Sequence, residues 1–206
     1  MTIFGRNLST SAMQALVYPL PTTMGNTMVM VNGAPAPLYY VSPGQINFQM
    51  PSNTPLGNAR VEVNVGGQQV SSLEVQPVMV TAVDPGMYMN GPRAAALNPD
   101  LTPHTAATPQ PPGAILAFYI TGHGAVKPAV PDGSAAPAAP LSMIEGTTQA
   151  TIGGLPAEVT FAGLSPGYAG LAQVNIRIPQ GLSQGDHPAF IVINGIPSNA
   201  GLISVR

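Results

Sequence analysis

The sequence of 206 residues contains no cysteine and very few charged side chains. The absence of cysteine excludes a disulfide framework and metal sites built on thiolates. Charged residues make up only 7% of the chain, against about 25% in an average globular protein. Lys127 is the one lysine among six basic residues, so a nucleic-acid binder that works by counterion release is excluded.

Proline and glycine are abundant instead, with 24 and 23 residues. A proline roughly every nine residues interrupts helices and excludes a coiled coil or a helical bundle. Because 45% of the chain is hydrophobic, the composition does not indicate disorder. The class that remains is an all-β protein with many turns.

No targeting or membrane segment is predicted. The first six residues lack the basic and apolar stretches of a signal peptide, and the apolar run over residues 114–120 is too short to span a bilayer. We therefore expect a chain without a membrane span, or a piece of a longer protein.

An internal repeat organises the sequence. Residues 45–51 (QINFQMP) reappear as residues 173–179 (QVNIRIP), and both copies alternate apolar and polar residues as a half-buried strand does. The repeat extends over further pairs of segments: 31–36 with 152–157, 40–44 with 161–167, 61–67 with 190–195, and more faintly 3–8 with 120–125. The pair 61–67 and 190–195 is typical of hairpins with a glycine turn.

These features predict two tandem immunoglobulin-like β-sandwiches. We expect the first domain over residues 1–78 and the second over residues 79–206. Within the second domain, residues 86–89 and 93–97 are expected to form strands. Two proline-rich surface loops are expected, over residues 98–112 and 127–140.

The two copies differ at their first strand. The second copy has a full strand over residues 113–120, whereas the first has only residues 1–4 in that place. An incomplete edge strand exposes backbone groups and is a template for strand addition. The candidate assembly edge consists of Met1, Thr2, Ile3 and Phe4. Either an upstream segment is missing, or a neighbouring subunit or domain supplies a strand.

Candidate catalytic and metal-binding groups are few. His104, His123 and His187 lie beside proline or glycine in expected loops, which indicates turn or surface residues. The sequence has no H-x-x-x-H or H-E-x-x-H motif, and no G-x-S-x-G elbow stands between an expected strand and an expected helix. We therefore predict no catalytic residue, no metal ligand and no cofactor.

Three glycine-containing turns could be mistaken for ligand sites. Asp84 and Asp132 precede proline or glycine, as turn residues do. Calcium binding through Asp84, Asp100 or Asp132 is a weak alternative, because no D-x-D-x-D cluster is present. The Gly122-His123-Gly124 segment lacks the further glycine and the lysine of a phosphate loop and is predicted to be a tight turn.

Tyrosines are the candidate ligand-contacting side chains. Tyr39, Tyr40, Tyr119 and Tyr168 could form a platform on which sugars stack, with Tyr39 and Tyr168 as the candidate glycan-stacking pair. Neighbouring residues of a strand point to opposite faces. We therefore expect at least one of Tyr39 and Tyr40 in the core.

Longer segments of the chain resemble a known family. They are residues 3–5, 36–47, 91–98, 119–124, 152–154, 161–168, 170–175, 179–182 and 198–199. They resemble the Solibacter-type C-terminal domain of large secreted acidobacterial proteins, whose repeats are similar to IPT/TIG immunoglobulin-like domains. The short first strand and the proline-rich 98–112 loop depart from that pattern. The resemblance implies a place at the C-terminus of an exported protein and gives no active-site residues to carry over.

The functional hypothesis is a non-catalytic extracellular or cell-surface module that packs into a larger assembly, such as a filament or surface layer. A surface poor in charge has little repulsion to keep copies apart. The expected partners are copies of the chain or neighbouring domains of the same protein. The alternative is an adhesion module that binds a polysaccharide or a protein, and an enzyme is the least favoured class.

Overall fold

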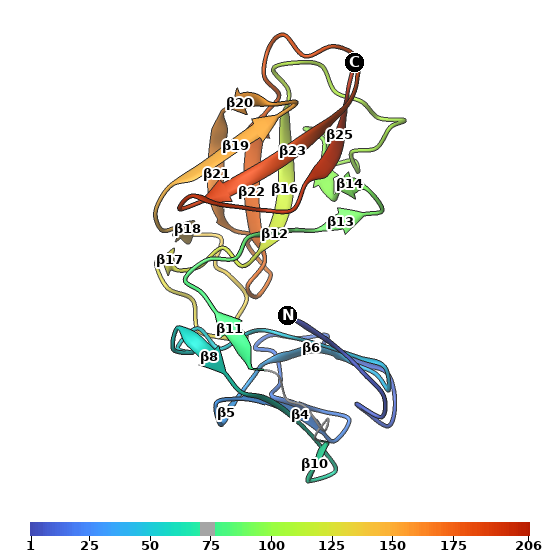
Figure 1. The fold of residues 1–206 in the computed structure, drawn as a ribbon, viewed down its shortest axis with the longest axis vertical. Helices are drawn as coiled ribbons and strands as arrows, with labels where there is room; N and C mark the ends of the chain where they lie inside the picture. The colour runs from blue at the N-terminus through green and yellow to red at the C-terminus, as the bar shows by residue number, and fades with distance from the viewer. Residues whose placement is uncertain (71–76) are drawn as a thin grey trace. The chain divides into compact units, whose positions relative to one another are not determined.

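The computed structural model describes residues 1–70 and 77–206 (Figure 1). The regular elements of these residues are all β-strands. No helix among the described residues is long and apolar enough to cross a membrane. The strands form two compact units, which confirms the predicted all-β tandem sandwiches. Unit 1 comprises Met1–Ala82, Val130–Ala136 and Gly167–Gly170, and unit 2 comprises Val83–Ala129, Pro137–Pro166 and Leu171–Arg206.

The predicted division of the chain after residue 78 stays a prediction. In the structure the chain first passes from one unit to the other between Ala82 and Val83. Part of the predicted first domain, residues 71–76, lies outside the described residues.

One sheet of unit 1 has the order β1-β7-β6-β2. Its strands are β1 (Thr2–Phe4), β7 (Gln45–Phe48), β6 (Leu38–Val41) and β2 (Met13–Gln14). In β7, Ile46 and Phe48 are buried while Gln45 and Asn47 lie on the other face and are partly exposed. The alternation predicted for this segment is therefore confirmed.

The other main sheet of unit 1 has the order β10-β9-β4-β3, with β5 paired to β4. The remaining strands of the unit are β3 (Thr23–Met24), β4 (Thr27–Val31), β5 (Ala34–Pro35), β8 (Gly57–Ala59), β9 (Val61–Val65), β10 (Gln68–Val70) and β11 (Val78–Val80), and β8 pairs with β11. The turn between β9 and β10 is formed by Gly66 and Gly67, both with positive φ. Val29, Leu38 and Phe48 belong to a continuous apolar core.

One sheet of unit 2 has the order β12-β16-β22-β21-β18-β17, and β15 also pairs with β16. Its strands are β12 (Gly86–Met87), β15 (Ala96–Leu97), β16 (Ile115–Thr121), β17 (Val126–Lys127), β18 (Met143–Ile144), β21 (Val159–Leu164) and β22 (Ala172–Arg177). Alternate residues of β16 and β22 are buried, as the sequence predicted for the segment that forms β22.

The second sheet of unit 2 has the order β13-β14-β25-β23-β19-β20, with β24 paired to β23. Its strands are β13 (Met89–Asn90), β14 (Arg93–Ala94), β19 (Thr148–Ile152), β20 (Leu155–Ala157), β23 (Gly185–Ile193), β24 (Ile196–Pro197) and β25 (Gly201–Val205). In Figure 1, β19, β23 and β25 form one layer and β16, β21 and β22 lie in the other. Phe118, Ile176, Ile191 and Ile203 are buried. The strands expected near residues 86–89 and 93–97 are present.

The strand register corrects the faintest part of the predicted repeat. Ile3 pairs with Ile46. The repeat equates Ile46 with Val174, and Val174 pairs with Phe118. Ile3 therefore occupies the position of Phe118 and not that of Ile120, two residues further along. A shift of two residues leaves every side chain on the same face, which is why the sequence alone did not reveal it.

Candidate functional site

A buried histidine anchors the loop that follows β15 in unit 2. The His104 side chain is only 5% exposed. Its Nε2 accepts a hydrogen bond from the Ser204 backbone N–H at 2.9 Å, so its Nδ1 carries the proton and donates to Asn98 Oδ1 at 2.8 Å. Burial, assisted by the positive charge of Arg93, lowers the pKa of His104 below its ordinary value of 6.5. His104 lies in a loop, as expected, but the surface position offered for it is wrong because the side chain is buried.

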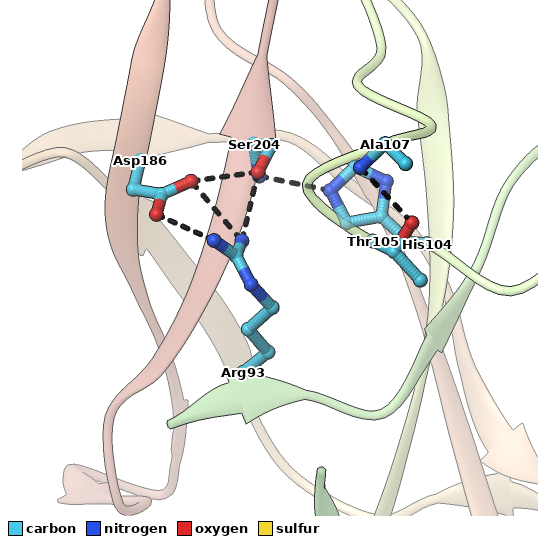
Figure 2. A network of polar contacts seen from close by, with 6 residues as sticks. All are labelled: Arg93, His104, Thr105, Ala107, Asp186 and Ser204. Carbon is cyan, nitrogen blue, oxygen red and sulfur yellow. Dashed lines mark hydrogen bonds and ion pairs between the residues drawn. The ribbon is translucent and has the colours of Figure 1, made fainter. Parts of the chain in front are cut away.

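An ion pair adjoins this histidine (Figure 2). Arg93 donates to both carboxylate oxygens of Asp186, at 3.0 and 2.6 Å, and to Ser204 Oγ at 2.8 Å. Ser204 Oγ in turn donates to Asp186 Oδ1 at 2.6 Å. The hydrogen bonds from Arg93 and then Ser204 lower the pKa of Asp186. The paired donors thus hold the carboxylate in its ionised form.

This cluster contains a serine, a histidine and an aspartate, but not in a nucleophilic arrangement. His104 Nε2 accepts from the backbone N–H of Ser204, not from its hydroxyl. The hydroxyl donates to Asp186. A serine nucleophile needs a base aimed at its oxygen and a partner that orients the base. The arrangement acts instead as a clamp that ties β14, β23 and β25 to the loop after β15.

The predicted tight turn at Gly122-His123-Gly124 lies beside the predicted turn at Asp84. Gly122 has a φ of 68°, and a Cβ atom added there would overlap the carbonyl oxygen of Asp84. Asp84 N–H donates to the Gly122 carbonyl at 2.8 Å. The close approach of two backbones accounts for glycine at this position, which fits a tight turn.

The remaining polar candidates serve loops and strand ends. Asp132 accepts a hydrogen bond from Ser52 N–H at 2.9 Å, and Asp100 accepts one from Thr102 Oγ1 at 2.6 Å. Half-buried His187 donates from Nε2 to the Ser183 carbonyl at 2.8 Å. In the part of the chain that the structure describes, no three histidine, aspartate or glutamate side chains gather as metal ligands would.

Tyr39 and Tyr40 do not divide between the two faces of their strand. Both are half-buried, whereas Leu38 and Val41 on either side of them are fully buried. The register shifts between Leu38 and Tyr40, and such a bulge inserts one extra residue outside the core. The prediction that one of these tyrosines is a core residue is therefore wrong.

The two candidate glycan-stacking tyrosines both belong to unit 1. The Tyr39 hydroxyl donates to the Ala169 carbonyl, and neighbouring Tyr168 is 53% exposed. The loop that carries Tyr168 is thus tied to the Tyr39 side chain. Their role in glycan stacking stays a prediction.

The candidate assembly edge forms the first strand of the β1-β7-β6-β2 sheet. The Met1 amino group donates to the Phe48 carbonyl at 2.7 Å, and Gly5 N–H donates to the Gly44 carbonyl at 3.1 Å. Because backbone groups of an antiparallel strand alternate in direction, those of Thr2 and Phe4 point away from β7. Among the described residues, β7 is the only strand paired with β1.

The corresponding edge of unit 2 is covered. β16 pairs with β22 on one side, and on the other side with β12 through Met87 and Ile120 and with β15 through Ala96 and Phe118. The two units therefore share a strand pattern, but within the part of the chain that the structure describes only unit 2 has further strands paired to its outer edge.

Two shallow hollows lie beside β19 in unit 2. They measure about 260 and 430 Å³, and they share Thr148 and Val159 in their linings. Neither lining includes a titratable side chain, so neither hollow brings together an acid and a base, as general acid–base catalysis requires.

Mainly antiparallel sheets packed as sandwiches define an immunoglobulin-like class of module. Within it, the IPT/TIG domain family matches residues 1–77. The finer resemblance to the Solibacter-type family stays a prediction. No curated protein matches the chain.

One similar solved structure is SGBP-B of the Bacteroides ovatus mixed-linkage glucan utilization locus, in complex with a mixed-linkage heptasaccharide. The alignment covers 98% of this chain and 41% of that chain, with 18% sequence identity and a TM-score of 0.34. The chain thus spans less than half the length of that structure. A likeness at this TM-score has no bearing on function.

Proposed function

We propose that this chain is a non-catalytic adhesion module of an exported protein and that it binds through the β1-β7-β6-β2 sheet of unit 1. The observation that carries the proposal is an uncharged sheet with exposed apolar side chains at both edges. Its four strands contain no charged residue. Phe4 in β1 is 77% exposed, and Leu16, just after β2, is 89% exposed.

Such a surface favours binding over catalysis. Apolar groups gathered on a surface with polar surroundings mark interaction sites, and uncharged surfaces lose little hydration energy when they are covered. Because Phe4 and Leu16 are exposed, they contribute little to the core of unit 1. We expect their apolar side chains to stabilise a complex with a ligand instead.

Pelleting with insoluble surfaces tests the adhesion function. The full chain is incubated with isolated bacterial envelopes, cellulose, chitin and peptidoglycan, and the bound fraction is measured after centrifugation. We expect binding to at least one surface, and its loss in the double variant Phe4→Lys, Leu16→Lys. The matched control Leu56→Lys, Leu101→Lys adds the same charge at exposed leucines outside this sheet. The proposal is wrong if no surface retains the wild-type chain, or if both double variants behave alike.

A second candidate function, self-assembly into a filament or surface layer, is favoured by the outer edge of β1, with which no strand of residues 1–70 or 77–206 pairs. Outward-pointing backbone groups of Thr2 and Phe4 could pair with a strand of another copy. Sedimentation velocity and electron microscopy over a concentration series would then show ordered association. Thr2→Pro removes one outward N–H and leaves the bonds to β7 in place, so it should abolish that association. A wild-type chain that stays monomeric throughout contradicts self-assembly.

A further inference from the structure

The outer face of one sheet carries the same side-chain arrangement in both units. In unit 1, Phe4 pairs with Gln45 and Tyr40 pairs with Asn47. In unit 2, Tyr119 pairs with Gln173 and Phe161 pairs with Asn175. We call these four-residue sets the amide faces of units 1 and 2. Each set has an aromatic ring on either side of a glutamine–asparagine pair.

The burial of the residue between the two amides shows that each amide face points away from the core. Ile46, between Gln45 and Asn47, is fully buried, as is Val174 between Gln173 and Asn175. Because side chains alternate along a strand, the two amides and the rings opposite them lie on the outer surface.

The two amides of each face hold each other in position. Gln45 Nε2 donates to Asn47 Oδ1 at 2.8 Å, and Gln173 Nε2 donates to Asn175 Oδ1 at the same distance. The Thr2 hydroxyl also donates to Asn47 Oδ1, at 3.1 Å. An amide group has two donor hydrogens and an acceptor oxygen. The Asn47 Nδ2 group makes no hydrogen bond within the described residues, so its donors remain available to a ligand.

The bulge is repeated together with the amide face. The register of β21 shifts between Val159 and Phe161, as the register of β6 shifts between Leu38 and Tyr40. In each unit the bulge brings an aromatic residue opposite the asparagine. Bulges redirect side chains next to functional sites, and this one completes the aromatic–amide arrangement in both units.

We propose that the amide face of unit 1 binds a neutral polysaccharide, with Phe4 and Tyr40 stacking on sugar rings and the Gln45 and Asn47 amides bonding to hydroxyl groups. The inference rests on the proposed adhesion function and names its ligand class. Aromatic rings present flat apolar surfaces, and a site that combines apolar contact with a few fixed polar groups suits a small uncharged ligand unit. The face has no charge to attract an anionic polymer.

The amide face of unit 2 is a weaker version of the same site. The Phe161 ring packs over Gly163, where an added Cβ atom would lie 2.8 Å from its Cζ atom and 3.3 Å from Met143 Sδ. The ring therefore lies against the sheet and is half-buried, whereas Phe4 in unit 1 is 77% exposed. Unit 1 is the principal site.

Affinity electrophoresis tests this inference. The full chain is run in native gels that contain xyloglucan, hydroxyethylcellulose or galactomannan, with anionic alginate for comparison. We expect at least one neutral polymer to retard the wild-type chain, and alginate not to. Phe4→Ala and Asn47→Ala should each raise the dissociation constant about tenfold. Asn175→Ala should have a smaller effect. Leu56→Ala, which removes an exposed apolar side chain outside the sheet, should have none.

The outcomes separate the ligand class from the adhesion function. Thermal unfolding of each variant first establishes that it folds as the wild type does. No retardation by any neutral polymer, or equal retardation of wild type and Phe4→Ala, overturns the glycan site. If the chain still pellets with envelopes after periodate has oxidised their sugars, but not after protease treatment, the ligand is a protein and adhesion stands. If neither gels nor pelleting show binding, both proposals fail.

Discussion

Replacing His104 by alanine should destabilise unit 2 through two orphaned polar groups. The ring accepts from Ser204 N–H and donates to Asn98 Oδ1, and both partner residues are almost fully buried. Each buried group without a partner costs about 1–3 kcal/mol, so we expect a loss of about 3 kcal/mol in the free energy of unfolding. For a unit of this size, that lowers the unfolding temperature by about 10 °C or more.

Urea unfolding followed by circular dichroism measures this loss. His104→Gln is the matched control, because its side-chain oxygen can accept from Ser204 N–H in place of Nε2. The glutamine variant should therefore retain more stability than the alanine variant. A loss below about 1 kcal/mol for His104→Ala would show that the histidine bonds do not hold the loop, and would refute this account of the clamp.

A comparison of the wild type with His104→Gln tests the protonation state of His104. Its pKa is lowered in the folded chain from an ordinary value of 6.5, so folding favours the neutral ring. The stability that the neutral ring contributes to the folded state is fully present above about pH 6.5 and declines as the pH falls below that value. The wild type should lose stability relative to His104→Gln between about pH 7 and pH 5. A constant difference between the two proteins over this range contradicts a neutral buried ring.

Two further predictions concern the turns and the cores. Gly122→Ala should lower the urea midpoint of unfolding strongly, because an added Cβ would meet the carbonyl oxygen of Asp84 at a backbone φ of 68°; an unchanged midpoint would refute the close approach. Phe48→Ala and Phe118→Ala should each cost about 3–5 kcal/mol, the first in unit 1 and the second in unit 2. Proteolysis under mild urea should accordingly expose a different unit in each variant, and identical cleavage patterns would contradict separate cores.

Sequence patterns predicted the regular parts of the fold because the alternation of apolar and polar residues along a strand follows the alternation of buried and exposed side chains. Ile46 and Val174 are buried as expected, and the glycine turns lie where hairpins need positive φ. The bulge at Tyr39 was not predictable, since it breaks the alternation on which the prediction rests. His104 was missed for a related reason. A polar loop residue is buried only when distant groups, here Ser204, supply its hydrogen bonds.

The candidate binding surface was predicted only in part. The short first strand pointed to Phe4 as part of a candidate assembly edge, and Tyr39 and Tyr168 were chosen because aromatic rings suit sugars. The amide faces depend on which residues pair across strands, and the sequence repeat misplaced the first strand by two residues. Correct register was needed to bring Phe4 opposite Gln45 and Tyr40 opposite Asn47.

The most direct test of the adhesion function is the pelleting measurement on the full chain and its two double-lysine variants. The account predicts that the wild type and the Leu56→Lys, Leu101→Lys control bind at least one insoluble surface, and that Phe4→Lys, Leu16→Lys does not. Equal binding by all three proteins, or binding by none, would contradict an adhesive sheet in unit 1.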